Sequence, residues 1–309
     1  MAAADDVRER LTALLDFATP PAAPPLEVRG TTPREGYTED RVAFTGAEGA
    51  VPAYLLVPAG AHDAGARRPG VVVHHQHHSE WHLGKSEVAG RAGDPLQAFG
   101  PALARRGLVV LAPDAPGFED RRASGPGLEP RDGDGLQHMN EMAYRLVAGR
   151  LLMTTVLRDA AAALSVLAAH GGVDPARVGV AGHSYGGNTT LFHAALDDRV
   201  RFACASGAAC TYRRRIADRT AIELAQIVPG IREIADLDDV VGLIAPRPLL
   251  LVSAPGDVYS ADADAIERAV APRFPRGALR HARFAGGHAL TPERFTLIVD
   301  WVAEAAAAT

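Results

Sequence analysis

A serine stands at the centre of the pentapeptide Gly182-His183-Ser184-Tyr185-Gly186. The residues before it (178–181) have a strand pattern and those after it (185–196) a helical pattern, so this G-x-S-x-G motif occupies a strand–turn–helix junction. Glycines two positions before and after the serine leave the space that so tight a turn needs. The turn would raise the hydroxyl group above the sheet, at a helix N-terminus that favours negative charge. We therefore interpret Ser184 as a nucleophile, with a purely structural turn as the alternative.

A serine hydroxyl is a weak nucleophile unless a base lies beside it, and after this motif the expected chain order is serine, acid, histidine. His288 follows the last predicted strand, in a loop where Gly286 and Gly287 let the backbone approach the serine. His281 competes with it, but it lies within the predicted strand 279–284 and is interpreted as structural. His288 is thus the predicted general base; a solvated loop histidine is the alternative.

The acid is expected after the penultimate strand, which the apolar run 248–253 indicates. Asp257 follows that run closely. Asp262 and Asp264 come slightly later, where aspartate in the first turn of a helix is common because it interacts with the helix dipole. Asp257 is therefore the predicted residue that orients the catalytic histidine.

Acyl transfer also needs two backbone N–H groups that stabilise the oxyanion. One is expected from Tyr185, directly after the nucleophile, and the other from the loop after the third sheet strand. That loop has the sequence His74-His75-Gln76-His77-His78, after the apolar strand 71–73. The amide of His77 is the first choice for the second donor, and the amide of Gln76 is the next.

Five histidines lie within residues 74–82, which suggests a zinc site as an alternative use of this loop. Adjacent histidines on a strand point to opposite faces, however, and no helical HExxH spacing is present. We interpret His74 as a core residue and His75 as a brace for the loop. We expect no metal and no other cofactor.

Four further residues, His138, Tyr212, Arg213 and Glu119, are candidates for substrate binding. His138 follows a stretch rich in Gly and Asp, from which it could reach the pocket. Tyr212 precedes three consecutive arginines, whose simplest interpretation is a solvated charge run; the alternative is a clamp for a substrate carboxylate. Glu119 lies in the loop after strand 108–114, where ion pairs that hold the loop are favoured over catalysis.

The elements that must position these residues alternate between strand and helix. Strands are predicted at 41–46, 51–57, 71–73, 108–114, 178–181, 202–206, 248–253 and 279–284, and helices at 1–19, 94–106, 139–170, 185–196, 261–271 and 292–307. This order implies an α/β fold with a mostly parallel sheet covered by helices on both faces. In such sheets ligands bind beyond the carboxyl ends of the strands, where the candidate residues lie.

Two segments do not fit the alternation. Residues 1–40 are predicted to be an N-terminal helix and a Pro-rich arm that precede one α/β domain at 41–309. Residues 207–247 are interpreted as an insertion above the sheet, a lid or a substrate wall.

The composition narrows the class of protein. The chain has 309 residues, of which 47% are hydrophobic and 22% charged, so a disordered protein is excluded. A net charge of −5 argues against a broad nucleic-acid-binding surface. No apolar run approaches the length of a membrane span, and the N-terminus lacks the apolar core of a signal peptide. We expect a cytoplasmic protein that acts on a small molecule, without nucleic-acid or membrane partners and with a homo-oligomer as an open option.

The chain from about residue 40 onward resembles the α/β-hydrolase superfamily, and within it the acetyl-xylan-esterase-like and dienelactone-hydrolase-like branch. The residues that carry the resemblance are His75-Gln76, Gly84-Lys85-Ser86-Glu87, Gly93-Asp94-Pro95, Arg106-Gly107, Ala112-Pro113-Asp114, Gly117 to Arg122, Gly182 to Gly187 and Ala245 to Leu250. The resemblance implies an α/β-hydrolase fold with a small lid-like insertion. It also implies a Ser–His–Asp acyl-enzyme mechanism on small esters or lactones. Dienelactone hydrolases use a cysteine nucleophile, so Ser184 favours the serine-esterase side.

These observations predict a serine hydrolase of a small carboxylic ester or lactone. A first alternative keeps the triad for acyl transfer, C–C cleavage or lyase chemistry on a specialised metabolite, because a fold does not fix a function. A histidine-dependent metalloenzyme and a non-catalytic binding module are alternatives of another class.

Overall fold

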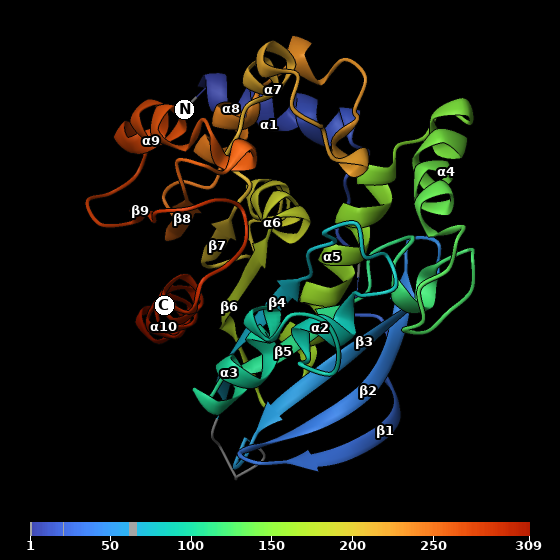
Figure 1. The fold of residues 1–309 in the computed structure, drawn as a ribbon. Coiled ribbons are helices and arrows are strands. Elements are labelled where there is room, and N and C mark those ends of the chain that lie inside the picture. Colours follow the sequence, from blue (N-terminus) through green and yellow to red (C-terminus); the bar gives the residue numbers. More distant parts are fainter. Residues whose placement is uncertain (1, 21, 62–66) are drawn as a thin grey trace.

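The computed structural model describes residues 2–20, 22–61 and 67–309. Its centre is a nine-stranded sheet with the strand order β1-β2-β3-β5-β4-β6-β7-β8-β9 (Figure 1). The strands are β1 (Glu27–Arg34), β2 (Tyr37–Gly46), β3 (Gly49–Pro58), β4 (Arg68–His74), β5 (Val109–Pro113), β6 (Val173–His183), β7 (Ala203–Ser206), β8 (Leu249–Ser253) and β9 (Leu279–Arg283).

The sheet has an antiparallel and a parallel part. Strands β1, β2 and β3 form an antiparallel meander, and β3 pairs antiparallel with β5. From β5 through β9 every neighbouring pair is parallel. The predicted mostly parallel sheet is therefore confirmed, and the carboxyl ends of β4 to β9 share one edge.

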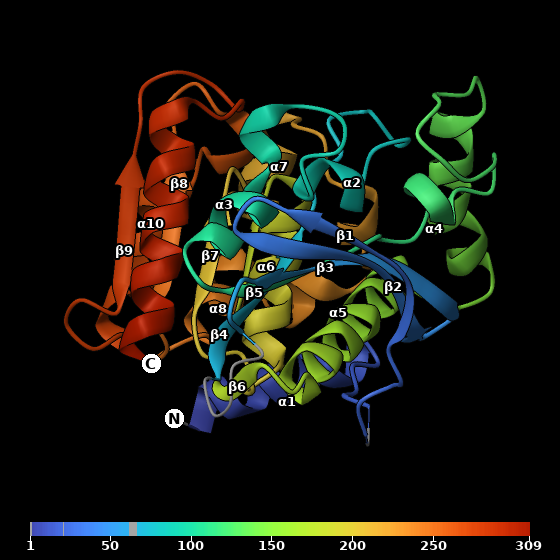
Figure 2. The same cartoon turned by 90° about the horizontal axis from the view of Figure 1, so that it is seen from below.

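Helices cover both faces of the sheet (Figures 1 and 2). The helices are α1 (Ala2–Leu14), α2 (Lys85–Val88), α3 (Phe99–Arg105), α4 (Asp134–Val147), α5 (Leu152–Ala169), α6 (Tyr185–Leu196), α7 (Tyr212–Asp218), α8 (Leu237–Gly242), α9 (Ala263–Val270) and α10 (Pro292–Ala308). Short 3-10 helices lie at Pro95–Gln97, Glu119–Arg121, Leu224–Gln226, Ile231–Glu233, Val258–Ser260 and Ala271–Arg273.

The two faces bury separate apolar cores because side chains alternate along each strand. Val72 packs with residues of α1, α5, α6 and α8 on one face. Its neighbours Val71 and Val73 pack with residues of α3 and α10 on the other. All three valines are fully buried, which is why this strand is a continuous β-branched run rather than an alternating pattern.

Three features differ from the prediction. The sheet begins at Glu27 rather than at residue 41, because β1 forms within the segment predicted to be an arm. It is an exposed edge strand that contains Gly30 and Pro33, so it has no apolar pattern, and an edge strand tolerates the proline. The predicted helix at 139–170 is two helices, α4 and α5, separated at Gly149, which has φ +69°. The predicted helix at 94–106 is a 3-10 turn followed by α3.

Helix α5 differs from the prediction that the chain has no apolar stretch long enough to span a membrane. With 18 residues it is long and apolar enough to cross a membrane by length and composition alone, contrary to the expectation that no such stretch exists. In the structure 78% of it is buried inside the protein, against β2, β4, β5 and β6. Its apolar character is thus accounted for by its place in the core.

The segment 207–247 contains α7, α8 and two 3-10 helices and joins β7 to β8. Asp236 caps α8 and also accepts hydrogen bonds from the amides of Tyr212 and Arg213, at 2.6 and 3.1 Å, so it ties the two helices together. Residues 221–224 of this segment line the cavity described below.

Candidate active site

Ser184 lies on the sharp turn between β6 and α6, as the G-x-S-x-G motif predicts. It has φ +56° and ψ −117°, a strained backbone conformation for a residue with a side chain. A Cβ atom on Gly182 would collide with the backbone of Gly186, and one on Gly186 would collide with the carbonyl oxygen of His74. The two glycines are therefore required, and the amide of Ser184 anchors the turn by donating to the carbonyl of Ser206 at 2.8 Å.

The three residues predicted as a triad are brought together. The Nε2 atom of His288 lies 2.7 Å from Oγ of Ser184, and its Nδ1 atom lies 2.9 Å from Oδ1 of Asp257. These distances are hydrogen-bond distances. In this arrangement Nε2 can take the proton of the serine, and Nδ1 can donate a hydrogen bond to the carboxylate.

Asp257 is buried and held by several donors. Its Oδ1 atom accepts from the amide of Tyr259 at 3.0 Å, and its Oδ2 atom accepts from the hydroxyl of Ser260 at 2.7 Å. Burial opposes ionisation, but the hydrogen bond and charge of His288, with these donors, lower the pKa of Asp257 below its usual value. The carboxylate is therefore ionised at neutral pH, as an orienting acid must be.

The loop that carries His288 is braced by a residue that the sequence reasoning did not identify. Arg294, on α10, is buried and donates to the carbonyl oxygens of Ala285, Gly287 and Ala289 at 2.8, 2.7 and 3.1 Å. One guanidinium group thus satisfies three carbonyls of the glycine-containing loop. No sequence pattern marks Arg294, because its partners are backbone atoms.

His183 is buried beside the catalytic histidine. Its ring centroid lies 4.9 Å from that of His288, and its Nδ1 atom contacts Oγ of Ser206 at 2.9 Å. Burial, and the positive charge that His288 can carry, lower the pKa of His183 to about 3. His183 therefore stays neutral and does not compete for the proton.

The loop after β4 packs directly on the nucleophile turn, as the position of Gly186 against His74 shows. His75 braces this loop: its Nε2 atom accepts from the amide of Ala115 at 3.1 Å, so its Nδ1 atom donates to the carbonyl of Gln76 at 2.6 Å. Burial lowers the pKa of His75 to about 4, which keeps the ring neutral. His74 is buried and contacts His193, as expected for a core residue.

A cavity of about 650 Å³ opens in front of Ser184 and His288. His77 and Trp81 line it on the side of the loop after β4, and Glu223 lines it on the side of the insertion. The Nε2 atom of His77 lies 2.6 Å from Oε2 of Glu223, so this contact joins the predicted oxyanion loop to the insertion.

In this contact Nε2 of His77 donates to the carboxylate of Glu223, since Nδ1 of the same ring accepts from the amide of Ser79 at 2.8 Å. Burial opposes the charge on both groups, but the carboxylate raises the pKa of His77 above its usual value. The neighbouring His138 and His77 lower the pKa of Glu223 to about 2. The carboxylate of Glu223 is therefore ionised and hydrogen-bonded within the wall of the cavity.

The four predicted substrate-binding residues separate into two groups. His138 does line the cavity, from α4 rather than from a loop. Tyr212 does not: its buried hydroxyl donates to the carbonyl of Gln226 at 2.9 Å. Arg213 is half-exposed and pairs with Asp238 at 2.7 Å. Glu119 is buried in an ion cluster away from the cavity. The arginine that does line the cavity is Arg215, which the charge-run interpretation did not single out.

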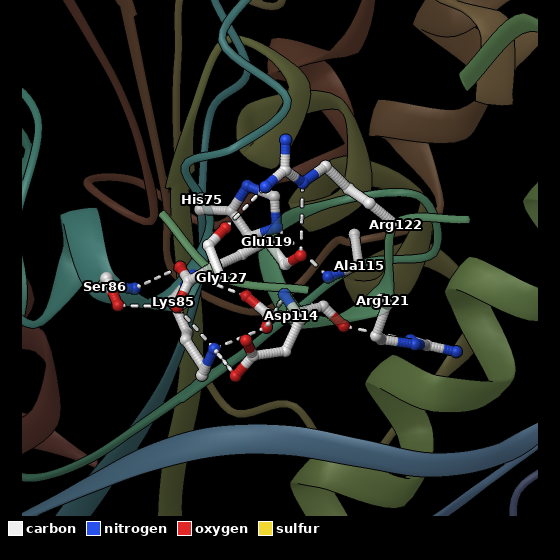
Figure 3. A network of polar contacts seen from close by, with 10 residues as sticks. His75, Lys85, Ser86, Asp114, Ala115, Glu119, Arg121, Arg122 and Gly127 are labelled. Atoms are coloured by element: carbon white, nitrogen blue, oxygen red, sulfur yellow. Dashed lines mark hydrogen bonds and ion pairs between the residues drawn. The ribbon is translucent and has the colours of Figure 1, made fainter. Parts of the chain in front are cut away.

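The ion cluster around Glu119 has Lys85, the one lysine of the chain, at its centre (Figure 3). The Nζ atom of Lys85 lies 2.7 Å from carboxylate oxygens of both Asp114 and Asp120, and it also contacts Glu119. Asp114 directly follows β5 and precedes Ala115, whose amide donates to His75. The cluster therefore helps to fix the loop after β5, which in turn holds His75 in place.

Lys85 is expected to be essential for stability at neutral and alkaline pH. Burial and the nearby Glu119 outweigh the ammonium group and raise the pKa of Asp114 to about 7. Lys85→Met removes the cation and raises that pKa further. A raised folded-state pKa gives stability at low pH that is lost as pH rises, so the variant should lose more at pH 8 than at pH 5.5.

The expected loss for Lys85→Met is about 3–5 kcal/mol in the free energy of unfolding at pH 8, measured by urea denaturation. The control is Arg106→Met, which breaks the exposed pair with Asp300 and should change that free energy by less than about 1 kcal/mol. A loss for Lys85→Met as small as the control's, or one independent of pH, would contradict a structural role for the cluster.

Known proteins resemble this chain in sequence and in structure. The sequence model of the prolyl oligopeptidase family matches residues 133–228. A curated relative, "Putative hydrolase YtaP" of Bacillus subtilis (strain 168), is 29% identical over 186 residues, which are 59% of this chain. The matched region spans 58% of that relative's length.

Solved esterase structures superpose over most of the chain. A "putative acetyl xylan esterase" from Bacteroides fragilis has a TM-score of 0.70 at 16% identity, over 91% of this chain and 74% of that one. Acetyl Xylan Esterase 1 from Thermoanaerobacterium sp. has a TM-score of 0.62 at 18% identity, over 97% of this chain and 94% of that one. A glucuronoyl esterase from Solibacter usitatus has a TM-score of 0.63 at 19% identity, over 97% of this chain and 92% of that one. The predicted fold and the resemblance to acetyl-xylan-esterase-like proteins are thus confirmed at the level of the fold.

Proposed function

We propose that this chain, a member of the α/β-hydrolase superfamily, hydrolyses a small carboxylic ester or lactone through a Ser–His–Asp acyl-enzyme mechanism. The observation that carries the proposal is the hydrogen-bonded series Ser184–His288–Asp257 at 2.7 and 2.9 Å, with the serine facing a cavity. The hydrolase relative and the esterase neighbours support an enzyme over a binding module. A binding module would also have no need of a serine held at φ +56°.

In this mechanism Oγ of Ser184 attacks the carbonyl carbon while Nε2 of His288 takes the hydroxyl proton. His288 then protonates the leaving alcohol oxygen, and the acyl group remains on the serine. A water molecule, deprotonated by His288, attacks the acyl carbon, and the proton returns to Ser184 as the acid leaves. Asp257 keeps Nδ1 of His288 protonated and stabilises the imidazolium that forms in each step.

The amides of Tyr185 and His77 are proposed to hold the oxyanion, with the amide of Gln76 as the second choice on the loop. Two observations support this assignment. Tyr185 is the first residue of α6, where the amide has no partner within the helix. His77 lines the cavity beside Ser184, whereas the side chain of Gln76 turns away to Glu87, at 3.2 Å.

The proposal predicts hydrolysis of nitrophenyl esters, measured by release of nitrophenolate across a series of acyl lengths. For the proposed small substrate, turnover should fall steeply beyond acetyl or butyryl. EDTA should leave the rate unchanged, and a fluorophosphonate should add one label per chain, on Ser184. Chelator-sensitive turnover without a label would favour the metalloenzyme instead. Absence of both turnover and label would overturn the esterase proposal.

A further inference from the structure

Arg215 is a buried cation in the wall of the active-site cavity, at the start of the insertion. It belongs to α7, is 2% exposed and lines the same cavity as Ser184 and His288. Its Nε atom donates to the carbonyl of Cys210 at 3.3 Å and its Nη1 atom donates to the carbonyl of Ala221 at 2.8 Å. Both partners are neutral, so neither compensates the charge.

The third nitrogen of this guanidinium group, Nη2, has no hydrogen-bond partner in the part of the chain that the structure describes. No carboxylate in that part of the chain lies within ion-pair distance of Arg215. A buried donor left without an acceptor costs free energy, and more so when it belongs to a charged group. A bound acceptor of negative charge would remove both costs.

The two neighbouring arginines differ from Arg215 because each forms an ion pair with a carboxylate. Arg213 pairs with Asp238, and Arg214 pairs with Asp218, each side chain being 50% exposed. Three consecutive arginines thus have two different environments. Only the one turned toward the cavity is without a carboxylate among the described residues.

The acidic group of the cavity is already engaged by another residue. Among the described lining residues Glu223 is the one carboxylate, and it accepts a hydrogen bond from His77 at 2.6 Å. The remaining polar residues of the described wall are neutral or can become cationic. Arg215 is therefore left as the cation of the wall that a substrate carboxylate can meet.

The position of Arg215 relative to His288 indicates which half of the ester carries the anion. The ring of Tyr259 packs on His288, with centroids 4.8 Å apart, and the guanidinium carbon of Arg215 lies 5.5 Å from the centroid of that same ring. Tyr259 therefore connects Arg215 to the residue that protonates the leaving alcohol. The alcohol half of the substrate must lie on this side of Ser184.

From these contacts we propose that Arg215 is a specificity-determining residue that binds a carboxylate on the alcohol half of the ester. The substrate class is then an O-acylated hydroxy acid, which the proposed hydrolysis converts into a free hydroxy acid and the acyl acid. This inference rests on the proposed function, because it uses the direction in which His288 delivers its proton.

The test compares two chromogenic acetate esters that differ in one group. The probes are 5-acetoxy-2-nitrobenzoate, whose leaving phenol carries a carboxylate, and 5-acetoxy-2-nitrobenzamide, in which a neutral amide of similar size replaces it. Arg215→Met should lower kcat/KM for the carboxylate by about 10- to 100-fold, and for the carboxamide by less than about threefold. Taking the ratio of the two effects cancels the difference between the two leaving groups. Arg215→Lys should restore part of the selectivity.

The matched control is Arg214→Met, which removes the adjacent, exposed arginine and should leave both rates within about twofold. Inhibition of the wild type supplies a measurement that needs no variant, in case Arg215→Met fails to fold. Hydrolysis of nitrophenyl acetate should be inhibited at least about tenfold more strongly by 3-hydroxybenzoate than by 3-hydroxybenzamide.

The outcomes separate the two proposals. Equal loss on both probes in Arg215→Met, or equal inhibition by the two phenols, would overturn the carboxylate site while leaving the esterase intact. A wild type that hydrolyses neither probe nor any nitrophenyl ester would overturn the esterase proposal itself, and the inference with it.

Discussion

Ser184→Ala is expected to lower kcat/KM for nitrophenyl acetate by about 10,000- to 1,000,000-fold. The alanine lacks the Oγ atom that lies 2.7 Å from Nε2 of His288. Attack would then have to come from water, helped only by the oxyanion donors and by binding. Because these remain, a low residual rate above the uncatalysed reaction is expected.

The control for this variant is Ser165→Ala, a buried serine of α5 whose hydroxyl donates to the carbonyl of Ala161 and which lies outside the cavity. It should keep the activity of the wild type within about threefold. The unfolding midpoint of Ser184→Ala should stay close to that of the wild type, because alanine keeps the Cβ atom and therefore the same strained turn. If Ser184→Ala retains more than about a tenth of the activity, the acyl-enzyme mechanism is wrong.

The reactive residues could be found from sequence because each follows a predicted strand. Ser184 follows the buried end of β6, Asp257 follows the buried, largely apolar β8, and His288 follows β9. Parallel strands bring their carboxyl ends to one edge, so a correct strand order in sequence already places these side chains near each other. The distances among them then follow from turn geometry that the glycines 182 and 186 enforce.

The residues that surround the triad could not be found in this way. Arg215 and Glu223 lie in an insertion without helical or strand periodicity, so the pattern says nothing about which of them faces the cavity. Arg213 was the arginine singled out, although it differs from Arg215 only by two positions on a short helix. On a helix that step turns the side chain to the opposite side, toward Asp238.

Ion pairs between residues far apart in the sequence could not be predicted either. The prediction for Glu119 was an ion pair within its loop, but its partner Lys85 lies 34 residues earlier in the chain. Strand β1 was missed for a related reason, since it is mostly exposed and is held to β2 chiefly by the pairing of the two backbones. In each case the partner is fixed by the fold and leaves no local signal.

Asp257→Asn is expected to lower kcat for ester hydrolysis by about 10,000-fold while changing KM little. The amide can present its NH₂ group to Nδ1 of His288, which would place the imidazole proton on Nε2, the atom that must accept from Ser184. It would also remove the negative charge that stabilises the imidazolium. Because the pKa of Asp257 is below its usual value of about 4, the wild-type group is ionised throughout the neutral range. The loss in kcat should therefore be found at every pH from 6 to 9, because the wild-type carboxylate does not titrate in that range.

The same lowered pKa makes a prediction about how the stability cost of Asp257→Asn depends on pH. A depressed folded-state pKa contributes stability above the unfolded pKa and loses it as pH falls through the folded one. The cost of Asp257→Asn in urea denaturation should thus be largest near pH 7 and shrink below about pH 4. Asp264→Asn is the matched control: it alters an exposed ion pair with Arg283 and should leave kcat within about twofold. A variant pair in which Asp264→Asn, and not Asp257→Asn, loses activity would assign the orienting acid to the other aspartate, because only the true partner of Nδ1 controls the tautomer of His288.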